Sequence, residues 1–250
     1  MAATISKRCL LIVLALLMVS CESIDMGDCF KNTGELVSEE FSFEGITTIR
    51  LHDNIDLYIY PDTSQRLILK AGSNLMDKIE AKKTDTVLTL RNNNNCNWVR
   101  SFNHPVEAHL YTDNLKTLFY YGFGLIESNG IIVSETSFHL NVHKGYGEIR
   151  LHVECKHFRM HYDTGGAKVT LTGEADYFGL VSGSTAPVRA EEFQARHVYV
   201  NHFGIADFWV NAQKVLDVEL HSAGNVVFVG EPEVTILDKT GSGEVIPAQW

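Results

Sequence analysis

Apolar and polar positions alternate with a period of two along most of the chain after residue 40. Segments 49–51, 55–59 and 87–90 follow this pattern, and turn-forming residues at 61–62 and 72–74 separate them. A period of two places successive side chains on opposite faces of a strand, so these segments predict β-strands. A single helical turn is predicted over residues 74–80. The pattern therefore predicts an all-β protein.

The second half of the chain repeats a short unit with a period close to 20 residues. Each unit places a glycine-containing triplet between two apolar positions, most clearly at 121–126, 144–149 and 240–245. The aligned positions lie 23, 20, 18, 21, 18 and 19 residues apart, at Gly122, Gly145, Gly165, Gly183, Gly204, Ser222 and Gly241. A coil of this length cannot bury its own apolar face and must stack on its neighbours. Hairpins of a β-sandwich usually repeat every 8–12 residues or so, and the longer spacing favours a parallel solenoid.

The repeat and the segments before it carry a resemblance to a known family. The Gly-Ser-Gly-acidic-Val unit, together with residues 43–49, 54–57 and 71–75 and with Ile79, resembles the head GIN domain of putative auto-transporter adhesins. Members of this family are common among Bacteroidota lipoproteins, and residues 95–100 resemble a Bacteroidota subgroup. The resemblance runs from about Cys29 to Val245 and departs where glycines are replaced, at 203–205 and 222–224. It implies a right-handed parallel β-helix with coils of about 20 residues that serves adhesion or surface interaction.

The N-terminal residues predict export. Lys7 and Arg8 precede an apolar run over residues 10–19, which is too short to span a bilayer but suits a signal peptide. Residues 17–21 resemble the lipobox of bacterial lipoproteins, which implies that Cys21 is acylated. The alternative is an ordinary signal peptide with an incidental cysteine. The predicted division is a signal peptide at 1–20, a tether at 21–40 and a β-helix domain at 41–250, anchored by lipid to the outer membrane on either face.

Charge and cysteine usage restrict the partners. The formal net charge of −10 becomes −12 once Lys7 and Arg8 are removed with the signal, because 19 basic residues then face 31 acidic ones. An acidic surface argues against nucleic acid and anionic lipid head groups as partners. Cys29 and Cys96 lie in polar, loop-like segments and are the favoured disulfide pair. Cys155 lies in an alternating strand and is expected to be a buried small apolar residue.

The sequence contains no recognised catalytic or cofactor motif. It lacks HExxH, GxSxG and a phosphate-binding loop with lysine, so we expect a non-catalytic protein without a cofactor. Two alternatives stay open: a polysaccharide-degrading β-helix enzyme and a purely structural envelope protein. An enzyme would need clustered carboxylates near a basic residue. The candidates are Asp163 with Lys168, and 191–192 with Arg189 and Arg196.

Five histidines fall within residues 139–161, at His139, His143, His152, His157 and His161. Two pairs, His139/His157 and His143/His161, are each separated by 18 residues and would stack in a coil of that length. Stacked imidazoles can hold a metal ion. Measured from the aligned glycines, however, His143 and His161 differ in phase. Outward polar positions are therefore favoured, and metal binding stays an open alternative.

Aromatic residues beside the glycine turns are the candidate ligand-binding residues. Phe123 and Tyr146 occupy the same place in consecutive units, and Tyr121 and Tyr162 lie close in phase. Exposed rings in a row could contact the faces of sugars or a surface protein. The alternative is that the rings fill the corners of the coils as internal ladders.

Overall fold

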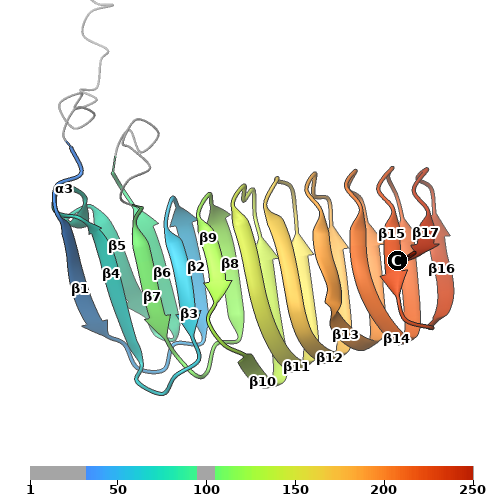
Figure 1. Cartoon of the computed structure of the whole chain (residues 1–250), viewed down its shortest axis with the longest axis horizontal. Coiled ribbons are helices and arrows are strands. Elements are labelled where there is room, and N and C mark those ends of the chain that lie inside the picture. The colour runs from blue at the N-terminus through green and yellow to red at the C-terminus, as the bar shows by residue number, and fades with distance from the viewer. Residues whose placement is uncertain (1–31, 95–104, 250) are drawn as a thin grey trace, which may run out of the picture.

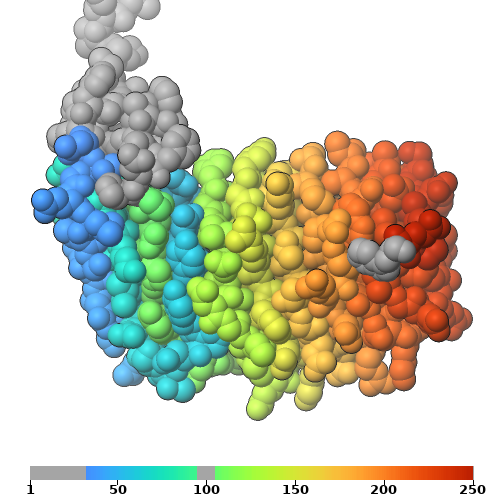
Figure 2. All heavy atoms as spheres, viewed as in Figure 1, coloured from blue at the N-terminus to red at the C-terminus, as the bar shows by residue number. Residues whose placement is uncertain are grey.

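The protein is a parallel β-solenoid of about seven turns, with coils about 20 residues apart. The computed structural model describes residues 32–94 and 105–249. Of these described residues, 65% lie in strands and 2% in helix, and the coils stack along the long axis (Figure 1). The predicted fold class and coil length are confirmed. Side chains fill the spaces between the ribbons, so the body is a continuous elongated block (Figure 2).

Each coil has two flat faces. Face A contains, in order along the solenoid, β1 (Leu36–Ser42), β4 (Arg66–Gly72), β7 (Glu107–Tyr111), β3 (Asp56–Tyr60), β9 (Leu125–Ser128), the first halves of β11 to β14, β15 (Val226–Val229) and β17 (Val245–Pro247). Face B contains β5 (Ile79–Thr84), β6 (Val87–Asn92), β2 (Thr48–Asp53), β8 (Thr117–Gly122), β10 (Ile132–Val142), the second halves of β11 to β14, and β16 (Glu233–Lys239).

Long strands that bend halfway supply both faces in the central coils. They are β11 (Glu148–Tyr162), β12 (Lys168–Ser182), β13 (Val188–His202) and β14 (Phe208–Leu220). The bends form one edge of the solenoid, the bend edge. The opposite edge, the turn edge, contains the glycine-rich turns that lead from face B to face A and lies uppermost in Figure 1.

The coils at the N-terminal end do not follow chain order. The coil of β2 and β3 lies between that of β6 and β7 and that of β8 and β9. Three antiparallel pairings close this end: β1 with β4, β4 with β7, and β5 with β6. The short helix α3 (Ser73–Met76) overlaps the first three residues of the predicted helical turn at 74–80 and begins one residue earlier. The expected tether at 21–40 overlaps β1, because Leu36–Ser42 pairs with β4 over its whole length.

The interior is filled by apolar ladders. Inward positions of successive coils hold fully buried side chains, and a cluster of rings from Phe138, Phe158, Phe178 and Phe193 fills the middle of the stack. Full burial of one such side chain stabilises the fold by about 1.5–3 kcal/mol. Within residues 32–94 and 105–249, no helix has the length and apolarity to cross a membrane.

Candidate functional site

Two of the predicted aromatic residues project into solvent from the turn edge. Phe123 is 60% exposed and Tyr146 is 62% exposed, although large rings are usually buried. Their ring centroids lie 6.1 Å apart and their planes are inclined by 15°, so the two rings form a stacked pair. They belong to consecutive turns, which are joined by a hydrogen bond from Tyr146 N–H to the carbonyl of Gly122 (3.1 Å).

Tyr121 belongs to a second row of rings just below this edge on face B. It is 36% exposed and stacks between His52 (4.6 Å between centroids) and His143 (5.0 Å). Further along the same edge, Phe203 is 52% exposed and stacks on His221 at 4.5 Å. The partner His52 could not be predicted from the sequence, because β2 and β8 become neighbours only through the exchanged order of the coils.

Tyr162 is not part of this exposed set, and its prediction as a ligand-binding residue is wrong. Only 1% of it is exposed, and its hydroxyl donates to the carbonyl of Ala167 (2.9 Å). Burial raises the pKa of Tyr162 to about 12, so the phenol remains a donor. Tyr120 has the same inward position on β8, where its hydroxyl donates to the carbonyl of Gly124 (2.6 Å). The internal-ladder alternative therefore applies to this position.

The histidine pairs do not stack as an 18-residue coil would require. In the register of β10 and β11, His139 lies opposite Arg159 and Asn141 lies opposite His161. Asp163 instead bridges His143 and His161, with 2.6 Å between His161 Nε2 and Asp163 Oδ1. Partial burial acts to raise the pKa of Asp163, but these hydrogen bonds outweigh it and hold the pKa below its ordinary value. Among the described residues, no group of three or more His, Cys, Asp or Glu side chains is arranged to hold a metal ion.

The cysteine predictions concern mainly residues outside the described part of the chain. Cys21, Cys29 and Cys96 lie outside it, so their lipidation and disulfide remain predictions. Cys155 lies in β11, partly buried against the core. Burial raises the pKa of this thiol to about 11, so it is protonated at neutral pH and a poor nucleophile.

The carboxylates proposed for an enzyme are not gathered into one site. Asp163 pairs with its two histidines rather than with Lys168, and Glu191 pairs with Arg189 at 2.5 Å. A groove of about 500 Å³ at the bend edge contains four other carboxylates and two basic residues: Glu135, Glu154, Glu174, Asp176, Lys156 and Arg196. Three of these carboxylates, those of Glu135, Glu174 and Asp176, belong to exposed residues. An acid catalyst for glycoside cleavage needs a desolvated carboxyl group, which solvated side chains do not provide.

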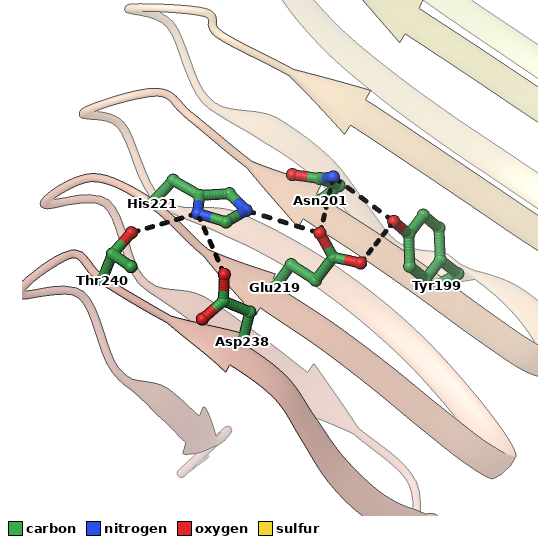
Figure 3. A network of polar contacts seen from close by, with 6 residues as sticks. All are labelled: Tyr199, Asn201, Glu219, His221, Asp238 and Thr240. Atoms are coloured by element: carbon green, nitrogen blue, oxygen red, sulfur yellow. Dashed lines mark hydrogen bonds and ion pairs between the residues drawn. The ribbon is translucent and has the colours of Figure 1, made fainter.

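A second groove, of about 270 Å³, crosses the outer surface of face B at Gly179. His139, Asn141, Arg159, His161, Tyr177, Val181 and Tyr199 also line it. Beside it runs a continuous polar network formed by Tyr199, Asn201, Glu219, His221, Asp238 and Thr240 (Figure 3). This groove was not predicted from the sequence, because its residues come from separate coils and meet only in the strand register.

The fold and the exposed rings define a class of protein: a solenoid that presents side chains on stiff, repetitive outer surfaces. Within this class, the chain belongs to the family described as "Putative auto-transporter adhesin, head GIN domain", whose model matches residues 45–232. The resemblance stated from the sequence is confirmed. No curated protein sequence matches the chain.

Solved structures share the fold. A putative adhesin from Bacteroides fragilis has a TM-score of 0.75 at 18% identity, covering 86% of this chain and 97% of that one. A putative lipid binding protein from Parabacteroides distasonis gives 0.64 at 15% identity, covering 87% and 98%. A putative adhesin from Parabacteroides merdae gives 0.58 at 14% identity, with the same coverage of 87% and 98%. At these identities the likeness extends to the fold alone.

Proposed function

We propose that this protein is a non-catalytic adhesin, anchored to the cell envelope through lipid on Cys21, that binds glycan through the rings of its turn edge. The observation that carries the proposal is the solvent-exposed stacked pair of Phe123 and Tyr146. Leaving two large rings in water forgoes the free energy that their burial would provide. Membership of an adhesin family and the predicted export signal agree with a binding role at a surface.

The chemistry of the edge suits carbohydrate. Aromatic rings offer flat apolar faces, and Tyr121 and Tyr146 add hydroxyl groups at the rim. The hydrogen-bonded coils beneath hold these rings in place, so little conformational entropy is lost when a ligand binds. A protein partner could bind the same rings, so the experiment must distinguish a glycan ligand from a protein ligand.

Lipid carriage has less support in the described residues. Apolar ligands need an internal cavity, whereas the inward positions of these coils are occupied by side chains such as Phe158, Phe178 and Leu180, which are fully buried. An acyl chain would have to displace this packing. We therefore do not propose lipid binding for this chain, although the similar structure from Parabacteroides distasonis is described as a putative lipid binding protein.

The test is a glycan-array screen of the purified protein and of the double variant Phe123→Ala/Tyr146→Ala. Leu237→Ala, which removes an equally exposed apolar side chain from β16 (54% exposed), is the matched control. We expect saturable binding that the control retains and the double variant loses, while all three proteins keep the same melting temperature within error. Binding that survives in the double variant would overturn the role of the edge rings. The absence of binding to any glycan would shift the proposal to a protein partner.

A further inference from the structure

The groove at Gly179 is a gap in an otherwise continuous row of side chains. Along face B, the register places His139, Arg159, Gly179, Tyr199 and Asp217 in one row across five coils. Adjacent strands lie about 4.8 Å apart, so Arg159 and Tyr199 project from backbones about 10 Å apart. No side chain of their own row lies between them, and the Tyr177 ring covers part of this gap. A Cβ atom at Gly179 would lie 2.9 Å from the Tyr177 ring, so glycine is needed for Tyr177 to lie over this gap.

Arg159 is distinguished by its lack of a partner. Each other arginine of residues 32–94 and 105–249 has an ion pair, a hydrogen bond or a ring contact, namely Arg50, Arg66, Arg91, Arg150, Arg189 and Arg196. Arg159 has none of these contacts, is exposed and lines the groove. On a protein with a net charge of −10, this guanidinium is a local site for an anion. Its planar fork matches a carboxylate in a bidentate geometry.

The opposite wall is held in place before any ligand arrives. The hydroxyl of Tyr199 donates to Glu219 (2.9 Å), and the Asn201 amide donates both to Glu219 (2.9 Å) and to the Tyr199 oxygen (3.3 Å). Figure 3 shows how His221 extends this network toward the last coil. These bonds fix the Tyr199 ring beside the gap. Both oxygens of the nearby Glu219 carboxylate already accept hydrogen bonds within the protein.

The remaining walls carry polar groups. Burial, followed by the charge of Arg159, lowers the pKa of His139, so its imidazole is uncharged at neutral pH. Its Nε2 contacts Ser137 Oγ (3.2 Å), which leaves Nδ1 for a ligand hydroxyl. Asn141 offers an amide beside it. Asp163 orients His161 from the far side. The groove thus combines one arginine without an ion pair, a fixed aromatic face and several hydrogen-bonding groups.

We propose that this groove binds an acidic sugar residue of a glycan, with the sugar carboxylate on Arg159 and the sugar ring against Tyr199. Asn141 and His139 would bind the hydroxyl groups. A polyanion with a phosphate on every unit fits less well, because the neighbouring coils place Asp217 and Glu219, not basic residues, beyond Tyr199. This inference rests on the proposed glycan-binding function but uses a different surface from that of Phe123 and Tyr146.

The test uses ligand pairs that differ only at C6, which is a carboxylate in the acidic sugar and a hydroxymethyl group in the neutral one. Oligomers of glucuronic acid against glucose, and of galacturonic acid against galactose, are titrated into the purified protein by calorimetry. We expect the acidic member of a pair to bind more tightly. Arg159→Gln should weaken acidic binding by about 10- to 100-fold and leave neutral binding unchanged, because a charge-assisted hydrogen bond is lost. Arg159→Lys should retain part of the preference, and Tyr199→Ala should weaken binding of both members. Arg196→Gln, which removes an equal charge at the bend edge, is the matched control.

The outcomes separate this inference from the proposed function. Acidic binding that depends on Arg159 but not on Phe123 and Tyr146 supports the groove and overturns the role of the edge rings. Glycan binding that depends on the rings, with no acidic preference and no effect of Arg159→Gln, overturns the groove and leaves the proposed function standing. An equal loss in Arg196→Gln would show a general charge effect and also overturn it.

Discussion

At the scale of single residues, the stacking of the coils leaves some backbone positions no room for a Cβ atom. Gly173 on β12 has φ +114°, and a Cβ there would lie 2.1 Å from the carbonyl oxygen of Val153 on the neighbouring strand. Gly45 also has a positive φ of +68° but has no atom within 4 Å of its Cβ position. The two glycines therefore separate the cost of backbone strain from the cost of close approach between coils.

We predict that Gly173→Ala lowers the free energy of unfolding by about 2–4 kcal/mol, because strain and a backbone clash add. Gly45→Ala should cost only about 1 kcal/mol, from the positive φ alone. Urea unfolding of both variants measures the difference. If both variants lost the same free energy of unfolding, the coils could move apart locally at little cost in stability.

His202 makes stability depend on pH. It is fully buried, its Nε2 lies 2.9 Å from the carbonyl of Ala206, and its Nδ1 accepts the N–H of Gly204 (3.0 Å). Burial lowers its pKa below the ordinary 6.5, so the folded protein resists protonation of this ring more than the unfolded chain does. The stability it provides is present above pH 6.5 or so and is lost as the pH falls toward the folded pKa.

We therefore predict that the free energy of unfolding falls between pH 7.5 and pH 5.5 or so, with a slope of at most about 1.4 kcal/mol per pH unit from this group. His202→Gln should lower that slope, because the amide does not titrate. His157→Gln, an exposed position on face B, should not change it. Denaturant titrations at several pH values give the slopes. An unchanged slope in His202→Gln would assign the effect to other groups, such as His52 and His139, whose pKa values burial also lowers.

At the scale of elements, the ring cluster at the centre of the stack ties four coils together. Phe158 contacts Phe138, Phe178 and Phe193, with centroids 5.1–5.7 Å apart. We predict that Phe158→Ala destabilises the protein by about 3–5 kcal/mol, because it opens a cavity that the hydrogen-bonded strands cannot close. Phe123→Ala removes the same atoms from an exposed ring and should change stability by less than about 0.5 kcal/mol. Thermal unfolding of the pair tests this, and similar losses would contradict the burial assigned to the two rings.

The same scale shows why the sequence predicted the coils but only part of the site. Glycines recur once per coil, so their spacing reveals the period directly. The position of a residue within its coil is harder to predict, because β11 and β8 differ in their distance to the turn glycine. Tyr162 lies three residues before Gly165, whereas Tyr120, which occupies the equivalent place in the strand register, lies two before Gly122. In a strand, an error of one residue moves a side chain to the opposite face. The aligned glycines therefore placed Tyr162 with the exposed rings.

The exchanged coils at the N-terminal end were beyond prediction for a different reason. Residues 48–60 and 87–111 have the same strand pattern, and neither contains a signal for its neighbour in the stack. Only the strand register shows that the coil of β2 and β3 lies next to β8 and β9. The groove at Gly179 is hidden similarly, since it requires the register of four strands, β10 to β13, at once.

At the scale of the whole molecule, the order of the coils determines which end of the solenoid lies nearest an N-terminal lipid anchor. β1 lies at one end of the long axis, and β16 and β17 lie at the other (Figure 1). Lipid on Cys21 would attach the solenoid by its β1 end and hold the later coils furthest from the membrane. The acidic surface, with a net charge of −12 once Lys7 and Arg8 are removed with the signal, would also keep these coils off anionic head groups. This arrangement presents both the turn edge and the groove at Gly179 to partners.

We predict that the protein expressed in a bacterial host incorporates a labelled fatty acid and fractionates with membranes. Cys21→Ala should lose the label, because this one mutation removes the residue expected to carry every acyl chain. Cys29→Ala, a cysteine eight positions further along, should keep the label. Label retained in Cys21→Ala would place the lipid elsewhere. Membrane association of the unmutated protein without any label would instead indicate that a surface of the solenoid binds the membrane. Arg159→Gln and Phe123→Ala/Tyr146→Ala would then show whether the groove or the edge rings form that surface.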